Sequence, residues 1–287
     1  MMRDQAAGLR EMFENKGKTM AVISGKGGVG KSNITLNFAL SLIQEGKKVL
    51  VIDLDIGMGN LHILLGENSK KTIVDFLEGD ADINNIINHN KMGLSFIFGG
   101  SGLHSILEWS EATFARFEYG IKELLKRYDY ILFDMGAGAT KDVIHLLLPM
   151  DYLLVVTTPE PTSITDAYSL LKFLCGNGNP QKTFLICNRA QSEKEGSSTL
   201  SRFKLAVERF LQHEMTSLGT VVEDLAVRNS VIEQVPFMIR YPNSKASKSV
   251  RRITHHFLAD FQEQTGQTKP SQFLTRLQSL FFERQGR

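Results

Sequence analysis

Residues 25–32 read Gly25-Lys26-Gly27-Gly28-Val29-Gly30-Lys31-Ser32, and this stretch decides the fold. It follows the short apolar run of residues 20–23 and precedes a helical pattern that stops at Gly46. The pattern GxxxxGK[ST] between a strand and a helix is typical of a phosphate-binding loop, because its glycines let successive backbone N–H groups point at phosphate oxygens. The stretch therefore predicts a nucleotide-binding α/β domain.

Further apolar runs of four or five residues follow this loop at helix-length intervals. They cover residues 49–52, 94–98, 130–133, 152–156 and 183–186, with a weaker candidate at 218–222. Uninterrupted apolar runs are typical of strands buried on both faces of a parallel sheet. We therefore expect a doubly wound α/β domain of the P-loop NTPase type, with a mostly parallel sheet and its ligands at the carboxyl ends of the strands.

The composition narrows the function classes. The chain has 287 residues, 42% of them hydrophobic, and a formal net charge of +2, which gives no sign of a bulk nucleic-acid binder. Cys175 and Cys187 lack a CxxC spacing, so neither a disulfide framework nor a metal-cluster carrier is expected. No apolar run approaches the roughly 18 residues that a membrane span needs, and no secretion signal is recognisable, so we expect a cytoplasmic protein.

Three parts are expected along the chain. Residues 1–17 form a short charged segment, residues 18–265 hold the nucleotide-binding domain, and residues 266–287 follow a break at Gly266 and Pro270. The domain organisation is thus one domain with a helical appendage at each end.

The residue types around the loop predict phosphate chemistry. Lys31 can reach the β- and γ-phosphates, and the hydroxyl of Ser32 is a ligand for Mg²⁺. Asp53 and Asp55 follow the second apolar run on the same side of the strand, and Asp134 ends the run at 131–133. In such a site one carboxylate holds Mg²⁺ through water, and another orients the water that attacks. The alternative for residues 53–55 is an acidic turn with a capping role.

Lys26 is a second lysine that the general loop pattern does not require. With it, residues 26–32 match KGGxGK[ST] and resemble the deviant Walker A family, which includes MinD, ParA, the nitrogenase iron protein and arsenite-pump ATPases. The resemblance implies that Lys26 crosses a dimer interface to the partner's nucleotide, so that two protomers sandwich two ATP molecules. The alternative is a solvated loop lysine.

The acidic segments resemble the switches of MinD-like ATPases. Residues 53–60 resemble the switch I pattern DxDxGxxN, which implies that Asp55 positions the hydrolytic water and Asp53 supports the metal. Asp134 and residues 135–138 resemble a Walker B element with a DxxAG switch II, although relatives usually carry Thr or Ser-Pro at 135–136. The predicted catalytic residues are Lys26, Lys31, Asp55 and Asp134, and the predicted metal residues are Ser32, Asp53 and Asp134.

The base site is expected at Asn188, at the end of the run 183–186. Its amide can pair with the adenine edge as donor and acceptor, and the family uses an asparagine here. The alternative is ordinary turn chemistry. The sequence lacks an NKxD pattern after Asn188, which favours ATP and ADP over guanine nucleotides. The predicted nucleotide contacts are Gly25, Gly27, Gly28, Val29, Gly30, Lys31, Ser32, Asn33, Asn188, Arg189, Pro236 and Phe237.

The last residues form an amphipathic helical pattern after Pro270, with Ser271 as its N-cap. One face carries Phe273, Leu274, Leu277, Leu280 and Phe281. The helix either docks on its own core or lies in a membrane interface. The break before it favours the membrane, and two helices joined in an ATP dimer would bind lipid in a nucleotide-dependent way, as in MinD.

The segment Asp4-Gln5-Ala6-Ala7-Gly8-Leu9-Arg10 resembles the DQAxxLR segment of the FlhG family, the MinD-like ATPases that regulate flagellar number and placement. The resemblance implies that Asp4, Gln5, Leu9 and Arg10 activate the GTPase FlhF, a relative of the signal-recognition-particle GTPases. Gln5 would enter the catalytic site of FlhF, where a glutamine can orient water without any charge.

Together these features predict a slow, Mg²⁺-dependent ATPase switch that forms a homodimer with ATP and binds the inner face of the cytoplasmic membrane. Its expected partners are FlhF and the flagellar basal-body switch proteins, with no nucleic acid. The alternative is a ParA-like DNA-partitioning ATPase, in which Lys245, Lys248, Arg251 and Arg252 form a DNA-binding patch. A solvated helix face is the simpler account of these four cations.

Overall fold

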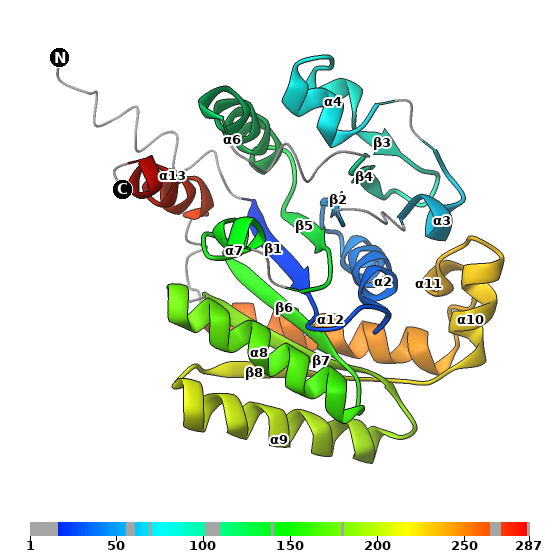
Figure 1. Ribbon diagram of the computed structural model, residues 1–287. Coiled ribbons are helices and arrows are strands. Elements are labelled where there is room, and N and C mark those ends of the chain that lie inside the picture. The colour runs from blue at the N-terminus through cyan, green and yellow to red at the C-terminus, as the bar shows by residue number, and fades with distance from the viewer. Residues whose placement is uncertain are drawn as a thin grey trace.

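The computed structural model describes residues 17–55, 61–68, 71–100, 110–138, 141–178, 181–264 and 271–285. Within these residues the fold is built on an eight-stranded sheet of order β3-β4-β2-β5-β1-β6-β7-β8 (Figure 1). Its strands are β1 (Lys18–Ile23), β2 (Val49–Leu54), β3 (Asn88–His89), β4 (Ser95–Ile97), β5 (Tyr130–Met135), β6 (Tyr152–Thr157), β7 (Lys182–Ala190) and β8 (Met215–Val222). All neighbours pair in parallel except β3 and β4. The predicted doubly wound, mostly parallel sheet is confirmed.

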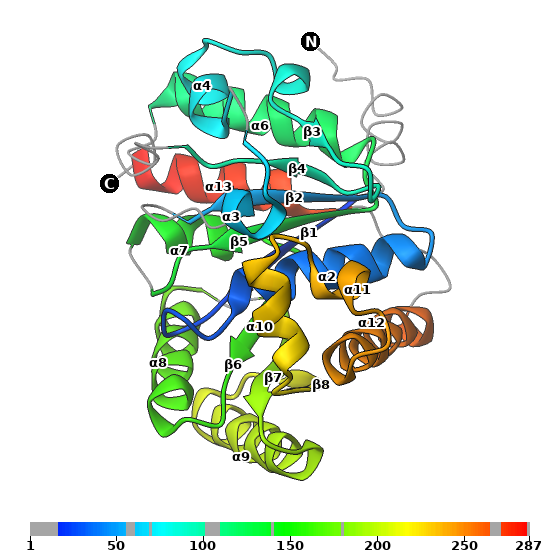
Figure 2. The ribbon, with the colours of Figure 1, turned by 90° about the vertical axis from the view of Figure 1, so that its right-hand side faces the viewer.

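Helices cover both faces of this sheet. They are α2 (Lys31–Gln44), α3 (Leu61–Leu65), α4 (Ile73–Glu78), the 3-10 turn η1 (Ile83–Asn85), α6 (Glu111–Leu125), α7 (Lys141–Leu147), α8 (Pro161–Asn177), α9 (Glu193–Leu211), α10 (Leu225–Ile232), α11 (Phe237–Arg240), α12 (Lys245–Gln264) and α13 (Phe273–Gln285). Figure 2 shows α2 and α12 on one side of the sheet and α7 and α8 on the other.

Strand β1 shows why the apolar runs are continuous. Met20 and Val22 face the core layer that holds α2 and α12, whereas Ala21 and Ile23 face the layer that holds α6 and α8. Side chains alternate along a strand, so a strand covered on both faces needs apolar residues at every position. The central strands β1 and β5 are therefore buried on both faces. Their carboxyl ends carry the phosphate loop and Asp134.

Two features of the sheet were not predicted. The two-residue strand β3 pairs antiparallel with β4 at one edge, and it is too short to have a periodicity of its own. Strand β7 runs on to Ala190, past the predicted end at residue 186, and its pairing with β8 has register shifts. The extension places Asn188 inside the strand, beside the phosphate loop.

Helix α13 docks on the core, beside α7 (Figure 1). Phe273 is fully buried, with its ring stacked on Phe133 at a centroid distance of 6.2 Å. Phe281 stacks on Phe114 at 3.9 Å, and Leu277 is also buried. The predicted helix is confirmed, and in this structure it takes the first of the two alternatives for its apolar face, which is docking on its own core. The apolar face of α13 has a lower free energy in these aromatic contacts than in water.

The whole predicted lipid-facing surface of α13 belongs to this contact. Leu274 and Leu280 are half-buried and pack on the same core layer as the other three residues. In this structure the surface faces protein. Among the described helices, none is long and apolar enough to cross a bilayer.

Asp151 holds the start of α13 in place. Its carboxylate accepts hydrogen bonds from the Ser271 hydroxyl at 2.6 Å and the Gln272 backbone N–H at 3.2 Å. The same carboxylate accepts from the backbone and the hydroxyl of Thr19, both at 3.0 Å. Ser271 also accepts from the Phe273 N–H at 3.2 Å, but it stands one residue before the cap position, because the first helical hydrogen bond runs from the Arg276 N–H to the Gln272 carbonyl. Asp151 thus ties the first residues of β1 to the last helix of the chain.

Candidate nucleotide-binding site

The phosphate loop has the shape that its glycines predict. It leaves β1 at Ile23 and enters α2 at Lys31, and Gly30 caps the helix in the left-handed region with φ 88°. A Cβ at Gly30 would lie 2.6 Å from the amide nitrogen of Asn188, so no larger residue fits there without a shift. The first N–H groups of α2 and its positive dipole end face the space above the loop, which suits a phosphate group.

Lys31 and Asp134 form a buried ion pair below the loop. The Lys31 Nζ lies 2.8 Å from Asp134 Oδ1, and the two side chains are 6% and 0% exposed. Thr35 donates its hydroxyl to the same oxygen at 3.1 Å. The other oxygen, Asp134 Oδ2, is buried and has no hydrogen-bond partner among the described residues. A buried carboxylate oxygen without a partner is costly, which suits a site completed by a ligand.

A second carboxylate stands next to Asp134. Asp53 pairs with Asp134 in the register of β2 and β5, and only 1% of it is exposed. Burial, and then the negative charge of Asp134, raise the pKa of Asp53 to about 7. Asp55 donates its backbone N–H to Asp53 Oδ1 at 3.0 Å, and burial raises the pKa of the Asp55 carboxyl as well. A cation that bound between these groups would favour their ionised forms.

These residues fit a Mg²⁺ ion that arrives with a nucleotide. Ser32 is half-buried in the first turn of α2, and Asp53 and Asp134 stand at the neighbouring strand ends. In the part of the chain that is described, no group of three or more His, Cys, Asp and Glu side chains could hold a metal by itself. Mg²⁺ in phosphate loops takes most of its ligands from phosphates and water, so it needs no such group.

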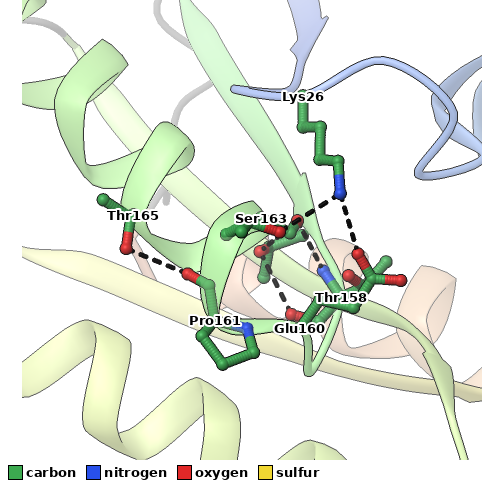
Figure 3. A network of polar contacts seen from close by, with 8 residues as sticks. Lys26, Thr158, Glu160, Pro161, Ser163 and Thr165 are labelled. Carbon is green, nitrogen blue, oxygen red and sulfur yellow. Dashed lines mark hydrogen bonds and ion pairs between the residues drawn. The ribbon is translucent and has the colours of Figure 1, made fainter.

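The second loop lysine points toward Glu160 at the start of α8 (Figure 3). The Lys26 Nζ lies 3.0 Å from Glu160 Oε2 and 3.1 Å from the Thr162 hydroxyl, at the start of α8. Its side chain is 43% exposed. Glu160 and Thr162 were not among the predicted site residues, although both follow the run 152–156 and therefore lie at the same sheet edge as the loop. The two loop lysines thus have different environments, one buried and one open.

Next to the loop lies a cavity of about 620 Å³. Of the predicted base contacts, Asn188, Arg189 and Phe237 line it together with Gly30 and Asn33. These residues come from β7, from α11 and from the loop with the start of α2, so three parts of the chain distant in sequence meet here. A cavity of this size beside a phosphate loop suits a purine base and its ribose.

Two details of this cavity concern single residues. Asn188 donates its amide to the backbone oxygen of Val29 at 2.8 Å, which joins β7 to the phosphate loop. Pro236 is buried and caps α11, but it does not line the cavity, so its predicted contact with the base is not supported by this structure.

The far wall of the cavity was not predicted from the sequence. This wall comes from the end of β8 and from α10: Val221, Val222, Glu223, Asp224, Val227, Arg228, Val231 and Ile232. The apolar run at 218–222 gave only a weak strand signal, and α10 has no motif. The parallel order of β7 and β8 was the available signal, because the residues after two neighbouring parallel strands meet at one edge.

Some predicted residues lie outside the described part of the chain. These are Asp4, Gln5, Leu9 and Arg10 at the N-terminus and residues 56–60 of the switch I pattern. In the switch II pattern, Met135 is buried at the end of β5, and the Gly138 N–H donates to the Ser24 carbonyl at 3.4 Å. The second switch therefore lies against the phosphate loop.

Comparison with known proteins agrees with this site. Residues 17–177 match the family described as "AAA domain". The chain is 38% identical over 248 residues to the flagellum site-determining protein YlxH of Helicobacter pylori, covering 85% of this chain and 83% of that protein. It is 30% identical to the antiactivator FleN of Pseudomonas aeruginosa, over 82% of this chain and 84% of FleN.

Solved structures agree as well. The cell division ATPase MinD of Pyrococcus furiosus superimposes with a TM-score of 0.69 at 26% identity, covering 85% of this chain and 99% of that chain. The phosphate loop, the paired acidic strand ends and these similarities lead to one conclusion. The chain belongs to the family of YlxH and FleN, which are P-loop ATPases of the MinD type.

Proposed function

We propose that this ATPase is a dimerising switch, in which ATP joins two protomers face to face and ADP lets them part. The observation that carries the proposal is the position of Lys26. It stands on the same loop as Lys31 but outside the buried ion pair, with its ammonium exposed and held by Glu160. An exposed ion pair is weak, so Lys26 can exchange Glu160 for the phosphates of a partner's nucleotide. The γ-phosphate adds the charge that makes ATP favour the dimer over ADP.

In hydrolysis the residues of this site have separate roles. The α2 N-terminus and Lys31 bind the phosphate groups, and Asp55 holds the attacking water in line with the γ-phosphate. Ser32, Asp53 and Asp134 would hold Mg²⁺, which would supply positive charge against the charge that develops on the phosphates. The site binds adenine nucleotides through Asn188 and the cavity beside it. Turnover is slow, because a switch needs a long-lived ATP state.

Membrane attachment would follow from release of α13. Its apolar face is the only part of the helix that would enter a bilayer, and that face packs on the core in this structure. We infer that the ATP dimer frees the helix, and that two helices together bind the inner face of the cytoplasmic membrane. One amphipathic helix binds lipid marginally, whereas two joined helices gain from a high effective concentration.

The switch would regulate flagellar number and placement. The resemblance at residues 4–10 supports activation of the GTPase FlhF, with Gln5 as the residue that acts in its catalytic site. The similarity to YlxH and FleN supports further contacts with flagellar basal-body switch proteins. The protein would therefore be cytoplasmic with ADP and peripheral on the membrane with ATP.

The experiment is size exclusion of the full chain with ADP and with ATP, for wild type, Asp55→Ala and Lys26→Ala. Asp55→Ala should stay dimeric with ATP, because it binds but does not hydrolyse. Lys26→Ala should stay monomeric while still binding nucleotide. A monomeric Asp55→Ala protein loaded with ATP would contradict the switch. Liposome flotation of the chain without residues 271–287 tests the membrane step separately, and undiminished flotation would remove α13 from that role.

A further inference from the structure

Asn37 is a fully buried polar side chain that the nucleotide chemistry described above does not use. It lies in α2, the helix that begins at Lys31, and its sequence neighbours Leu36 and Phe38 are buried as well. A buried amide without hydrogen bonds costs free energy. The partners of Asn37 therefore indicate its role.

The oxygen of Asn37 binds the backbone of α11. Asn37 Oδ1 accepts a hydrogen bond from the Met238 N–H at 2.9 Å, although 201 residues separate the two in the chain. Among the described residues, this is the one hydrogen bond between α2 and α11, which lie side by side (Figure 2). The Met238 N–H belongs to the first turn of α11 and has no partner within that helix. Asn37 thus caps α11 from a different helix.

The nitrogen of Asn37 binds Asn33, one turn earlier in α2. Asn37 Nδ2 donates to the Asn33 backbone carbonyl and to Asn33 Oδ1, both at 2.8 Å. A backbone N–H can only donate, so Met238 fixes the oxygen of Asn37 toward α11 and its nitrogen toward Asn33. The side-chain oxygen of Asn33 is thereby engaged, and its NH₂ group is left to donate to a molecule in the cavity that Asn33 lines.

Both partners of Asn37 belong to walls of the cavity beside the phosphate loop. Asn33 lines the cavity from α2, and Phe237, which directly precedes Met238, lines it from α11. The carbonyl of Phe237 is held separately, because it accepts from the Ser247 hydroxyl at 3.2 Å. Since α2 begins at the phosphate loop, the bond from Asn37 to α11 sets the distance between the loop and the Phe237 wall.

We propose that Asn37 is a positioning residue for the nucleoside part of a bound nucleotide. It acts through Asn33 and Phe237, which it holds in place before a ligand arrives. A preformed wall spares the ligand the cost of ordering it. The ligand class is a nucleoside di- or triphosphate, whose base and ribose occupy the cavity while its phosphates bind the loop. This role rests on the proposed function, in which the cavity holds the base.

The test compares ADP with pyrophosphate, each with Mg²⁺, by isothermal titration calorimetry on the full chain. Both ligands carry two phosphate groups, but only ADP has a base and a ribose, so the ratio of the two dissociation constants reports on the nucleoside site. Wild type should bind ADP at least about tenfold more tightly than pyrophosphate. Asn37→Leu should weaken ADP at least about tenfold and leave pyrophosphate within about twofold of wild type.

A second variant separates this effect from a loss of folding. Asn37→Ser can still donate to the Asn33 carbonyl, as serines in helices do, but its side chain is too short to reach the Met238 N–H. It should weaken ADP selectively as well, with a smaller loss of stability than Asn37→Leu. The matched control is Thr254→Val, which removes a buried hydroxyl that donates to the Val250 carbonyl at 3.0 Å in α12. Thr254 does not line the cavity, so this variant should lower the unfolding midpoint and leave the ratio within about twofold of wild type.

Three results would overturn the proposal. Equal losses of affinity for ADP and pyrophosphate in the Asn37 variants would assign Asn37 to the fold or to the phosphate site. Unchanged ADP affinity in folded Asn37→Ser would show that the bond to Met238 does not position the wall. A wild type that bound ADP no more tightly than pyrophosphate would show that the cavity does not hold the base, and this part of the proposed function would fail together with the role of Asn37.

Discussion

The ammonium group of Lys26 lies 3.0 Å from the carboxylate of Glu160, although 134 residues separate them in the chain. The contact holds the second loop lysine on its own protomer, at the start of α8, with its side chain 43% exposed. In the same loop, Lys31 is buried against Asp134. Two lysines five residues apart therefore have separate tasks, and substitutions can tell them apart.

Lys26→Gln should abolish ATP-dependent dimerisation and leave nucleotide affinity within about threefold of wild type, because Lys26 contributes no contact to its own phosphate site. Sedimentation with a slowly hydrolysed ATP analogue measures the dimer, and a fluorescent nucleotide measures the affinity. Dimers that form normally with Lys26→Gln would show that the exposed lysine is only a solvated loop residue.

Lys31→Met should reduce the free energy of unfolding by about 3–5 kcal/mol, because it leaves the Asp134 carboxylate buried and unpaired. The matched variant Lys26→Met breaks only the exposed pair with Glu160 and should cost no more than about 1 kcal/mol. Urea denaturation without nucleotide measures the free energy of unfolding of both variants. If the two variants lost the same stability, the contrast between a buried and an exposed pair would be wrong.

Gly25→Ala should destabilise the fold more than any other small change in the loop. A Cβ at Gly25 would lie 2.1 Å from the backbone carbon of Asp166, so β1 and α8 would have to separate. Gly176→Ala, near the end of the same helix, meets no atom within 4 Å and should stabilise the protein by up to about 1 kcal/mol. Thermal unfolding of the two variants should move in opposite directions.

Asp151→Ala should loosen α13 without changing its apolar face, because it removes the acceptor for Ser271 and Gln272. We expect liposome binding in the ADP state to rise several-fold above wild type, as measured by flotation. Asp82→Ala removes an exposed carboxylate that caps a 3-10 turn and serves as the control. Unchanged flotation of Asp151→Ala with ADP would separate the docking of α13 from any role in lipid binding.

His213 should make stability fall in mild acid. Burial lowers the pKa of His213 below its ordinary value of 6.5, while its ring hydrogen-bonds the Thr183 hydroxyl at 2.7 Å. The unfolded chain then binds a proton more readily than the folded chain below pH 6.5, so stability is present above that pH and is lost as the pH falls. The unfolding midpoint of wild type should drop more between pH 7 and pH 5 than that of His213→Gln. Exposed His255→Gln is the control and should follow wild type.

The sequence by itself determined the local parts of this protein. The glycine spacing of residues 25–32, ending in Lys31 and Ser32, predicted a phosphate loop between a strand and a helix. The continuous apolar runs predicted buried parallel strands, and the acids at their ends predicted that Asp53 and Asp134 belong to one site; only the structure shows them paired on neighbouring strands. The apolar stripe of residues 273–281 predicted α13. Each of these inferences needs only a few consecutive residues, because the physics that fixes them is local.

The tertiary structure decided which surfaces meet. The helical stripe was compatible with lipid or with protein, and only the rings of Phe133 and Phe114 at the right place made it dock on the core. Glu160, the partner of Lys26, and the far wall of the base cavity lie more than 100 residues from the phosphate loop in the sequence. No motif predicts either of them. Burial and ion pairing depend on the distance between groups in space, and a chain must fold before those distances exist.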